Sequence, residues 1–271
     1  MSRQVTNVFI WAVFVIGLLW LTPVVWKPWV SAEYATQRWV DDDGKGIVFW
    51  LEDAARFWGY RTYKPLYDLT HQYEKLDKEL VVFTLLDIIS SDKKENVAKI
   101  NNKLLDANSV NARMLGYFAS VTHQLPVSDA NVRIAEIRTV IGQQADVSNQ
   151  TQIKLAIRVA SDARIPDVTG LIGEHLNRRD VPYGVRVGAC KALEKVPERD
   201  QAFELLVAAI KRPIFYARAE CAEALSKLAN SSVGTIAALH EAIRVETDEI
   251  QRRRLRDILA NVASHESFGS P

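Results

Sequence analysis

The sequence predicts an all-α protein in which one transmembrane helix precedes an α-solenoid, that is, a stack of antiparallel helix pairs. The first observation is a pattern of small and apolar residues at 185–196 that recurs 32 positions later, at 217–228. A third copy runs from Arg252 to Val262. Self-similarity at a period of roughly 20 to 50 residues is typical of helical repeat proteins. The other two observations are an apolar run near the N-terminus and the lack of strand-like alternation of useful length.

Residues 1–29 are predicted to form a membrane anchor. Residues 8–26 hold no charged side chain and are almost wholly apolar. A helix of about 20 apolar residues spans the roughly 30 Å hydrocarbon layer of a bilayer. Trp26 and Trp29 stand where the interfacial aromatic belt of such a helix would lie. We therefore expect the chain to contact the lipid bilayer through residues 8–26.

A cleaved signal peptide is the alternative for this segment, since residues 30–32 (Val-Ser-Ala) would suit cleavage. The apolar run is longer than the roughly 7 to 15 residues of a signal peptide, which favours an uncleaved anchor. A buried helix of a soluble domain would rarely be so free of polar groups. The Lys and Arg count favours a cytoplasmic body, because Lys27, Arg38 and Lys45 follow the run and only Arg3 precedes it.

Residues 30–74 are predicted to form an aromatic-rich juxtamembrane region. All seven tryptophans fall within the first 58 residues of the chain. Apolar residues from 47 to 58, including Trp50 and Trp58, recur at helical spacing on one face. This helix would either lie in the membrane interface or pack on the first turn of the solenoid. The three aspartates at 41–43 are predicted to lie in a solvated polar loop.

The remainder of the chain is predicted to be a series of helices. Residues 75–149 carry degenerate repeats, residues 150–264 carry regular ones, and residues 265–271 form a disordered tail. Asp129 is placed to cap the helix that runs to Ile141. Helical patterns cover 79–89, 96–105, 110–122, 129–141, 153–160, 167–176, 185–196, 203–210, 217–228, 236–243 and 252–262.

The second helices of the pairs resemble HEAT-like repeats, in particular the short type first noted in phycobilisome lyases. The resemblance is good over about residues 150–264 and faint over 75–150. It implies a stack of helix pairs, but this repeat type says little about function. The matching patterns are Val185-Arg186-x-x-Ala189-x-x-Ala192-Leu193 and Ala217-Arg218-x-x-Cys221-x-x-Ala224-Leu225.

The resemblance also implies a ladder of charges between repeats. HEAT repeats usually place an acidic residue in the inter-helix turn, six positions before the basic residue of the second helix. Asp180 matches this pattern for Arg186, and Glu246 matches it approximately for Arg252. Six positions before Arg218 stands Arg212, so the ladder is interrupted there.

The sequence offers no pattern for catalysis or for a cofactor. Its five histidines are isolated from one another and from carboxylates or cysteines at metal-ligand spacing. No nucleophile motif and no glycine-rich phosphate loop occurs. We therefore predict no enzyme activity, no cofactor and no metal site. The two cysteines, Cys190 and Cys221, are too few for a disulfide framework and are expected to be buried free thiols.

A row of basic residues along the second helices is the predicted partner-binding site. Its members are Lys154, Arg186, Arg218 and Arg252. The row would either bind an acidic peptide or phosphate groups, or serve as the internal ladder between repeats. Because the formal net charge is only +1 and aromatic residues do not interleave with the basic ones, no nucleic-acid binding is expected.

These observations together predict a membrane-anchored helical-repeat scaffold or adaptor that binds a protein partner within a membrane-associated assembly. The alternative is a membrane-tethered, lyase-like protein that holds a small molecule in the concave groove of the solenoid. A pigment or other small ligand bound to the purified protein would distinguish the two.

Overall fold

The computed structural model describes residues 79–213, 215–229 and 233–268. Within these residues the chain forms eleven helices and no strand, which confirms the all-α prediction. No helix in the described part is long and apolar enough to cross a membrane. The predicted anchor at 8–26 and the interfacial residues Trp26, Trp29, Trp50 and Trp58 lie outside the described residues.

The chain divides into two compact units, the first of which ends at Ala119. Its described helices are α6 (Glu79–Ser91), α7 (Lys94–Leu105) and most of α8 (Val110–His123). Helix α8 approaches α7 closely at Gly116, where an added Cβ would lie 2.9 Å from the backbone nitrogen of Leu105. A larger residue at this position would therefore force the two helices apart.

The second unit begins at Ser120 and contains four consecutive helix pairs. Their order in the chain follows the helical patterns of the sequence closely. The helices are α9 (Ala130–Ile141), α10 (Gln150–Asp162), α11 (Thr169–Asn177), α12 (Tyr183–Leu193), α13 (Arg199–Ile210), α14 (Arg218–Ala229), α15 (Val233–Val245) and α16 (Glu249–Phe268).

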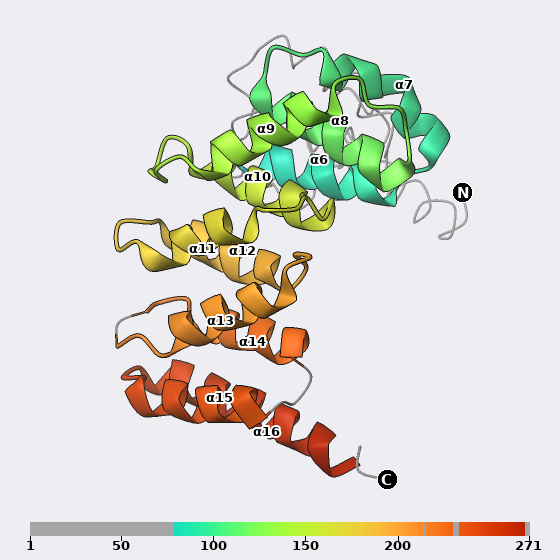
Figure 1. Cartoon of the computed structure of the whole chain (residues 1–271). Helices are drawn as coiled ribbons and strands as arrows, with labels where there is room; N and C mark the ends of the chain where they lie inside the picture. Colours follow the sequence, from blue (N-terminus) through green and yellow to red (C-terminus); the bar gives the residue numbers. More distant parts are fainter. Residues whose placement is uncertain (1–78, 214, 230–232, 269–271) are drawn as a thin grey trace, which may run out of the picture. The chain divides into compact units, whose positions relative to one another are not determined.

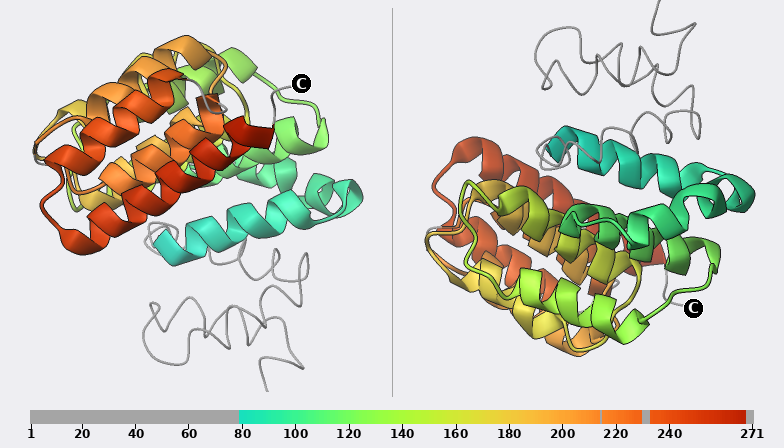
Figure 2. Two further views of the ribbon diagram at one scale, coloured as in Figure 1. Left: turned by 90° about the horizontal axis from the view of Figure 1, so that it is seen from below. Right: turned by 90° about the horizontal axis from the view of Figure 1, so that it is seen from above.

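Alternate helices of the second unit pack on one another and form two layers (Figures 1 and 2). The first layer contains α9, α11, α13 and α15, and the second layer contains α10, α12, α14 and α16. The stack has one continuous core because each pair leaves an apolar face that only the next pair covers. Helices α11 and α13 of the first layer approach closely at Gly173, where a Cβ would lie 2.6 Å from Cδ1 of Leu205.

Two local predictions differ from the structure. Asp129 precedes α9, but it takes a left-handed backbone conformation with a φ of 58° and its side chain makes no capping hydrogen bond. In the left-handed conformation this residue serves as a turn residue rather than as a cap. Helix α16 continues to Phe268, so it covers residues 265–268 of the segment expected to be disordered.

The prediction that Cys190 and Cys221 are free thiols is wrong. Both side chains are fully buried, and the structure joins them in a disulfide between α12 and α14. Their Cα atoms lie 4.7 Å apart, within the range that a disulfide can bridge. The bond therefore links two neighbouring helices of the second layer covalently.

The buried His175 of α11 predicts a loss of stability in mild acid. Its Nε2 lies 2.6 Å from the carbonyl oxygen of Ile141, while its buried Nδ1 has no hydrogen-bond partner among the described residues. Burial, assisted by the positive charge of Arg178, lowers the pKa of His175, although the hydrogen bond to Ile141 works in the other direction. The unfolded chain thus binds the proton more readily than the folded protein does.

We accordingly expect the contribution of neutral His175 to stability to be complete above its unfolded pKa of about 6.5 and to fall as the pH drops below that value. Urea denaturation of the full chain between neutral pH and pH 5 would measure this dependence. The variant His175→Gln cannot take up the proton, so its free energy of unfolding should fall less steeply over the same range. Parallel pH profiles of the two proteins would contradict the assignment.

Candidate functional site

The structure places the four predicted partner-binding residues on successive helices of the second layer. Lys154 lies on α10, Arg186 on α12, Arg218 on α14 and Arg252 on α16. Lys154 extends along α12, where a Cβ added at Gly184 would lie 3.3 Å from its Nζ. The three arginines lie close to the start of their helices, beside the turn that connects the two helices of a pair.

The three arginines share one structural task. Each donates hydrogen bonds to backbone carbonyl groups at or just beyond the end of the first helix of its own pair. Arg186 donates from Nη2 to the carbonyls of Arg178 (3.0 Å) and Arg179 (2.7 Å). Arg218 donates from Nε to the carbonyl of Ile210 at 3.0 Å. Since the last carbonyls of a helix have no partner within it, these arginines stabilise the turns.

The predicted ladder is not formed as expected: Asp180 pairs with Arg178 at 3.8 Å rather than with Arg186, and one rung with other partners is present among the described residues. The Glu246 carboxylate pairs with the guanidinium of Arg218, in the preceding pair, and both side chains are buried. Arg252 binds the Glu246 carbonyl oxygen and pairs with Glu249 instead, at 2.6 Å. Glu246 therefore reaches back to the arginine one pair earlier, because neighbouring pairs are stacked with their turns side by side.

Arg186 is the equivalent of Arg218 one pair earlier, and its environment is different. The residue that corresponds to Glu246 in the next turn is Arg212, by the spacing of six that relates Glu246 to Arg252 and Arg212 to Arg218. Arg186 is 8% exposed, and no described carboxylate forms an ion pair with it. Its Nε is buried and has no hydrogen-bond partner among the described residues.

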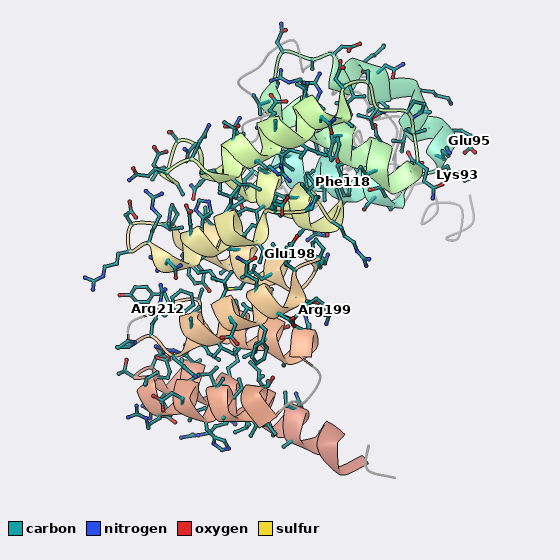
Figure 3. The ribbon with its side chains drawn as sticks, in the orientation of Figure 1. Lys93, Glu95, Phe118, Glu198, Arg199 and Arg212 are labelled. Atoms are coloured by element: carbon teal, nitrogen blue, oxygen red, sulfur yellow. A yellow bond between two sulfur atoms is a disulfide. The ribbon has the colours of Figure 1, made fainter. Side chains whose placement is uncertain are left out.

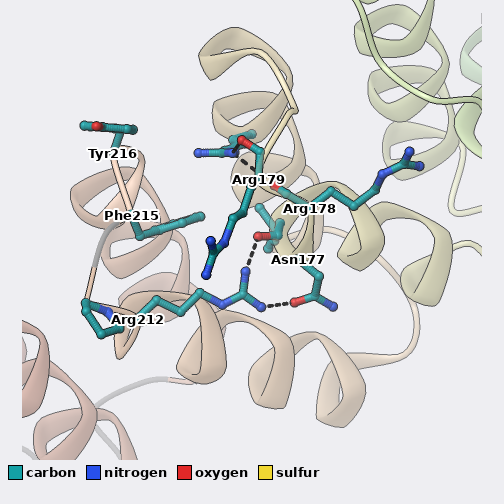
Figure 4. A pocket seen from close by; sticks show the side chains of 9 residues that line it. Asn177, Arg178, Arg179, Arg212, Phe215 and Tyr216 are labelled. Atoms are coloured by element: carbon teal, nitrogen blue, oxygen red, sulfur yellow. Dashed lines mark hydrogen bonds between the residues drawn. The ribbon is translucent and has the colours of Figure 1, made fainter.

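A cavity of about 520 Å³ lies beside Arg186, between the turn that follows α11 and the turn that follows α13 (Figure 4). Four arginines and no carboxylate line it. The Phe215 ring stands 5.9 Å from the guanidinium carbon of Arg186. The lining residues are Leu176, Asn177, Arg178, Arg179, Arg186, Arg212, Pro213, Phe215 and Tyr216. We call this cavity the arginine pocket.

Arg212 joins the two turns across the arginine pocket (Figure 4). It donates to the carbonyl of Leu176 at 2.5 Å and to the side-chain oxygen of Asn177. Burial, and after it the positive charge of Arg186, lowers the pKa of Arg212. In Figure 4 the side chain of Arg179 points toward Arg212, whereas that of Arg178 points away from it. The pocket thus gathers positive charge that its own lining residues do not neutralise.

Elsewhere in the second layer several basic residues have acidic partners. Ion pairs connect neighbouring helices, and even the arginine-rich start of α16 takes part in them. The pairs are Lys195 with Asp162 (2.7 Å), Lys227 with Glu194 (3.6 Å) and Arg254 with Glu220 (2.6 Å). In the arginine pocket only Arg178 has an ion-pair partner among the described residues, Asp180 at 3.8 Å. The guanidinium groups of the three other arginines have none, and such a cluster attracts anions.

Exposed apolar side chains follow the same side of the unit. Tyr183 at the start of α12 is 53% exposed, Tyr216 just before α14 is 73% exposed, and Ile250 near the start of α16 is 78% exposed. Figure 1 shows the turns that precede these three helices on one side of the second unit. Figure 3 labels Arg212 on this side and Arg199 at the other end of α13. We call the side that carries the three apolar residues and the arginine pocket the turn edge.

Sequence reasoning found Arg186 but missed the other residues of the arginine pocket. Two features of the sequence could have indicated these residues. The doublet Arg178-Arg179 precedes Asp180 directly, and Arg212 occupies the position where the repeat calls for an acidic residue. Only the stacking of successive turns brings these two places together.

Within the described residues no group of three histidine, cysteine or acidic side chains is arranged to hold a metal ion. Comparison of the chain with protein-family models, with curated proteins and with solved structures gave no match. The functional argument therefore rests on the geometry of the turn edge.

Proposed function

We propose that the protein is a helical-repeat scaffold that binds a protein partner along its turn edge, and that residues 8–26 hold it at a membrane. In this proposal the second unit is an α-solenoid of HEAT-like type. The observation that carries the proposal is the turn edge itself, where three exposed apolar side chains accompany a pocket in which three arginines have no ion-pair partner among the described residues. Single exposed apolar residues are common on protein surfaces, but apolar residues grouped beside polar ones mark interaction sites.

The two-layer packing supports this role. A stack of helix pairs repeats each surface position at a regular spacing, so that equivalent residues of successive pairs form an extended surface. Tyrosine and arginine, which both occur at the turn edge, are enriched among the residues that dominate binding energy at interfaces. The turn edge therefore has the residue types and the extent that a partner segment requires.

Affinity capture of the full chain from cross-linked native membranes, followed by mass spectrometry, tests the proposal. We expect one or two partners at near-stoichiometric yield. The double variant Tyr216→Ser/Ile250→Ser should fold normally, because both side chains are exposed, and should weaken partner binding by about fivefold or more.

Val132 on α9 supplies the matched control. It is an exposed apolar residue outside the turn edge, so Val132→Ser should leave the yield of partner unchanged. Equal yields from the wild type and from the double variant would contradict binding along the turn edge. Recovery of the protein without any partner would contradict the scaffold proposal as a whole.

The arginine pocket also favours a second candidate function, the binding of a small molecule. Its volume of about 520 Å³ falls within the roughly 300–1,000 Å³ that is typical of ligand sites. A lyase-like protein that holds a ligand would retain it through gentle purification. Native mass spectrometry and an absorbance spectrum of the purified full chain decide between the candidates, since a mass equal to that of the polypeptide argues against the ligand.

A further inference from the structure

The pairing of Arg218 with Glu246 shows what this repeat does with a buried arginine beside a turn. Arg218 binds backbone carbonyls on one side, and the carboxylate of Glu246, from the next turn, neutralises its charge. A buried guanidinium without a counter-ion loses its hydration and gains no ion pair in return. Glu246 thus supplies, from within the chain, the counter-ion of the buried Arg218.

Arg186 has no such counter-ion among the described residues. Arg186 binds the carbonyls of its turn just as Arg218 does, and it is similarly buried. Arg212 occupies the position of the missing acid, and its positive charge adds to that of Arg186 rather than neutralising it. The buried Nε of Arg186 has no acceptor among the described residues. The arginine pocket opens at the place where the acid would stand.

We propose that the arginine pocket binds a carboxylate side chain of the partner, which supplies to Arg186 from outside what Glu246 supplies to Arg218 from within. This inference rests on the proposed function and identifies the partner segment as acidic. Guanidinium groups bind carboxylates through paired, charge-assisted hydrogen bonds. Arg179 and Arg212 flank the entering group, and the ring of Phe215 forms an apolar wall for its methylene carbons.

The first test measures the binding of a fluorescein-labelled peptide of alternating Glu and Gly to the full chain in detergent, by fluorescence anisotropy. The peptide with Gln in place of Glu serves as its uncharged match. We expect saturable binding of the Glu peptide and at least about tenfold weaker binding of the Gln peptide, because charge-assisted hydrogen bonds are roughly twice as strong as neutral ones. Failure of the Glu peptide to bind would overturn the proposal.

The decisive variant is Arg212→Glu, which restores the acid that the repeat lacks. Its carboxylate would occupy the site beside Arg186, so we expect it to weaken the binding of the Glu peptide about tenfold or more. The matched control is Arg253→Glu, which makes the same change of charge at an exposed residue of α16 outside the pocket. Equal weakening by both variants would show a general charge effect and overturn the assignment to the pocket.

A milder variant guards against misfolding. Removal of Arg186 itself would also uncap the turn after α11, so its loss of binding would not be informative. Arg179 is exposed, so its positive charge can be removed without disturbing the core. We expect Arg179→Gln to keep the thermal melting curve of the wild type and to weaken the binding of the Glu peptide a few-fold. If neither single variant, Arg179→Gln or Arg212→Glu, weakens the binding of the Glu peptide, the proposal is overturned.

Competition with inorganic phosphate separates a partner carboxylate from a small free anion. Phosphate that displaces the Glu peptide at concentrations as low as those of the peptide would make a small anion the ligand and overturn the assignment to a partner. Capture from membranes with Arg212→Glu separates this inference from the proposed function. Full recovery of the partner with that variant would leave the scaffold intact and reject the pocket, whereas no partner with the wild type would reject the scaffold.

Discussion

Replacement of Arg218 by alanine is expected to lower the free energy of unfolding of the second unit by about 3–5 kcal/mol. Arg218 is 2% exposed, and its loss leaves the Glu246 carboxylate buried without a counter-ion. It also removes the hydrogen bonds to the carbonyls of Ile210 and Pro213. The melting temperature should fall by about 6–20 °C for a unit of this size, and calorimetry of the full chain would record the shift.

Arg244 provides the matched control for this prediction. It pairs with Glu241 at 2.5 Å, but its side chain is 72% exposed. Exposed ion pairs contribute little, so Arg244→Ala should leave the melting temperature nearly unchanged. In the double variant Arg218→Met/Glu246→Met no buried charge is left unpaired, and part of the lost stability should return. A small effect of Arg218→Ala would contradict the pairing across the stack.

Reduction of the disulfide between Cys190 and Cys221 is expected to lower the free energy of unfolding by about 2–4 kcal/mol. The bond closes a loop with a sequence separation of 31 residues, and its main effect is to restrict the unfolded chain. Urea denaturation of the full chain with and without a phosphine reductant measures the difference. The intact mass before reduction should be lower by two hydrogen atoms.

The variant Cys190→Ala/Cys221→Ala is the control for reduction. Its stability should be close to that of the reduced wild type and should not respond to the reductant. Thiols that react with an alkylating reagent in the unreduced, denatured wild type would show that the bond is not formed. Equal denaturation curves with and without reductant would contradict its contribution to stability.

Most of the helical order could be predicted from the sequence, because apolar residues recur at helical spacing in every described helix. The ends of helices were less predictable. The pattern suggested a helix from 167, but α11 begins at Thr169, since Asp167 takes a left-handed conformation with a φ of 57°. Turn residues of this kind depend on local hydrogen bonds and backbone strain, which apolar periodicity does not record.

The disulfide could not be predicted from the pattern of cysteines. Cys190 and Cys221 occupy positions one residue out of register in their repeats. Whether two side chains on neighbouring helices meet depends on the rotation of each helix about its axis. A shift of one residue corresponds to about 100° on a helix, and the repeat pattern alone does not fix the relative rotation of α12 and α14.

The candidate site was predictable only in part, for a similar reason. The repeat pattern identified Arg186. It also showed Arg212 at a position where such repeats usually have an acidic residue. Their proximity follows from the stacking of one turn on the next, which brings together residues that are 26 positions apart in the chain. The sequence pattern assigned each acid to the arginine of its own pair, whereas in the structure Glu246 reaches the arginine of the preceding pair.

The bond between Cys190 and Cys221 also bears on the cellular compartment in which the helical body lies. Glutathione and thioredoxin keep thiols reduced in the cytosol, whereas disulfides persist in the periplasm, the endoplasmic reticulum lumen and outside the cell. A helical body that carries this bond in vivo is therefore expected in an oxidising compartment. That location is the reverse of the one favoured by the few lysines and arginines beside residues 8–26.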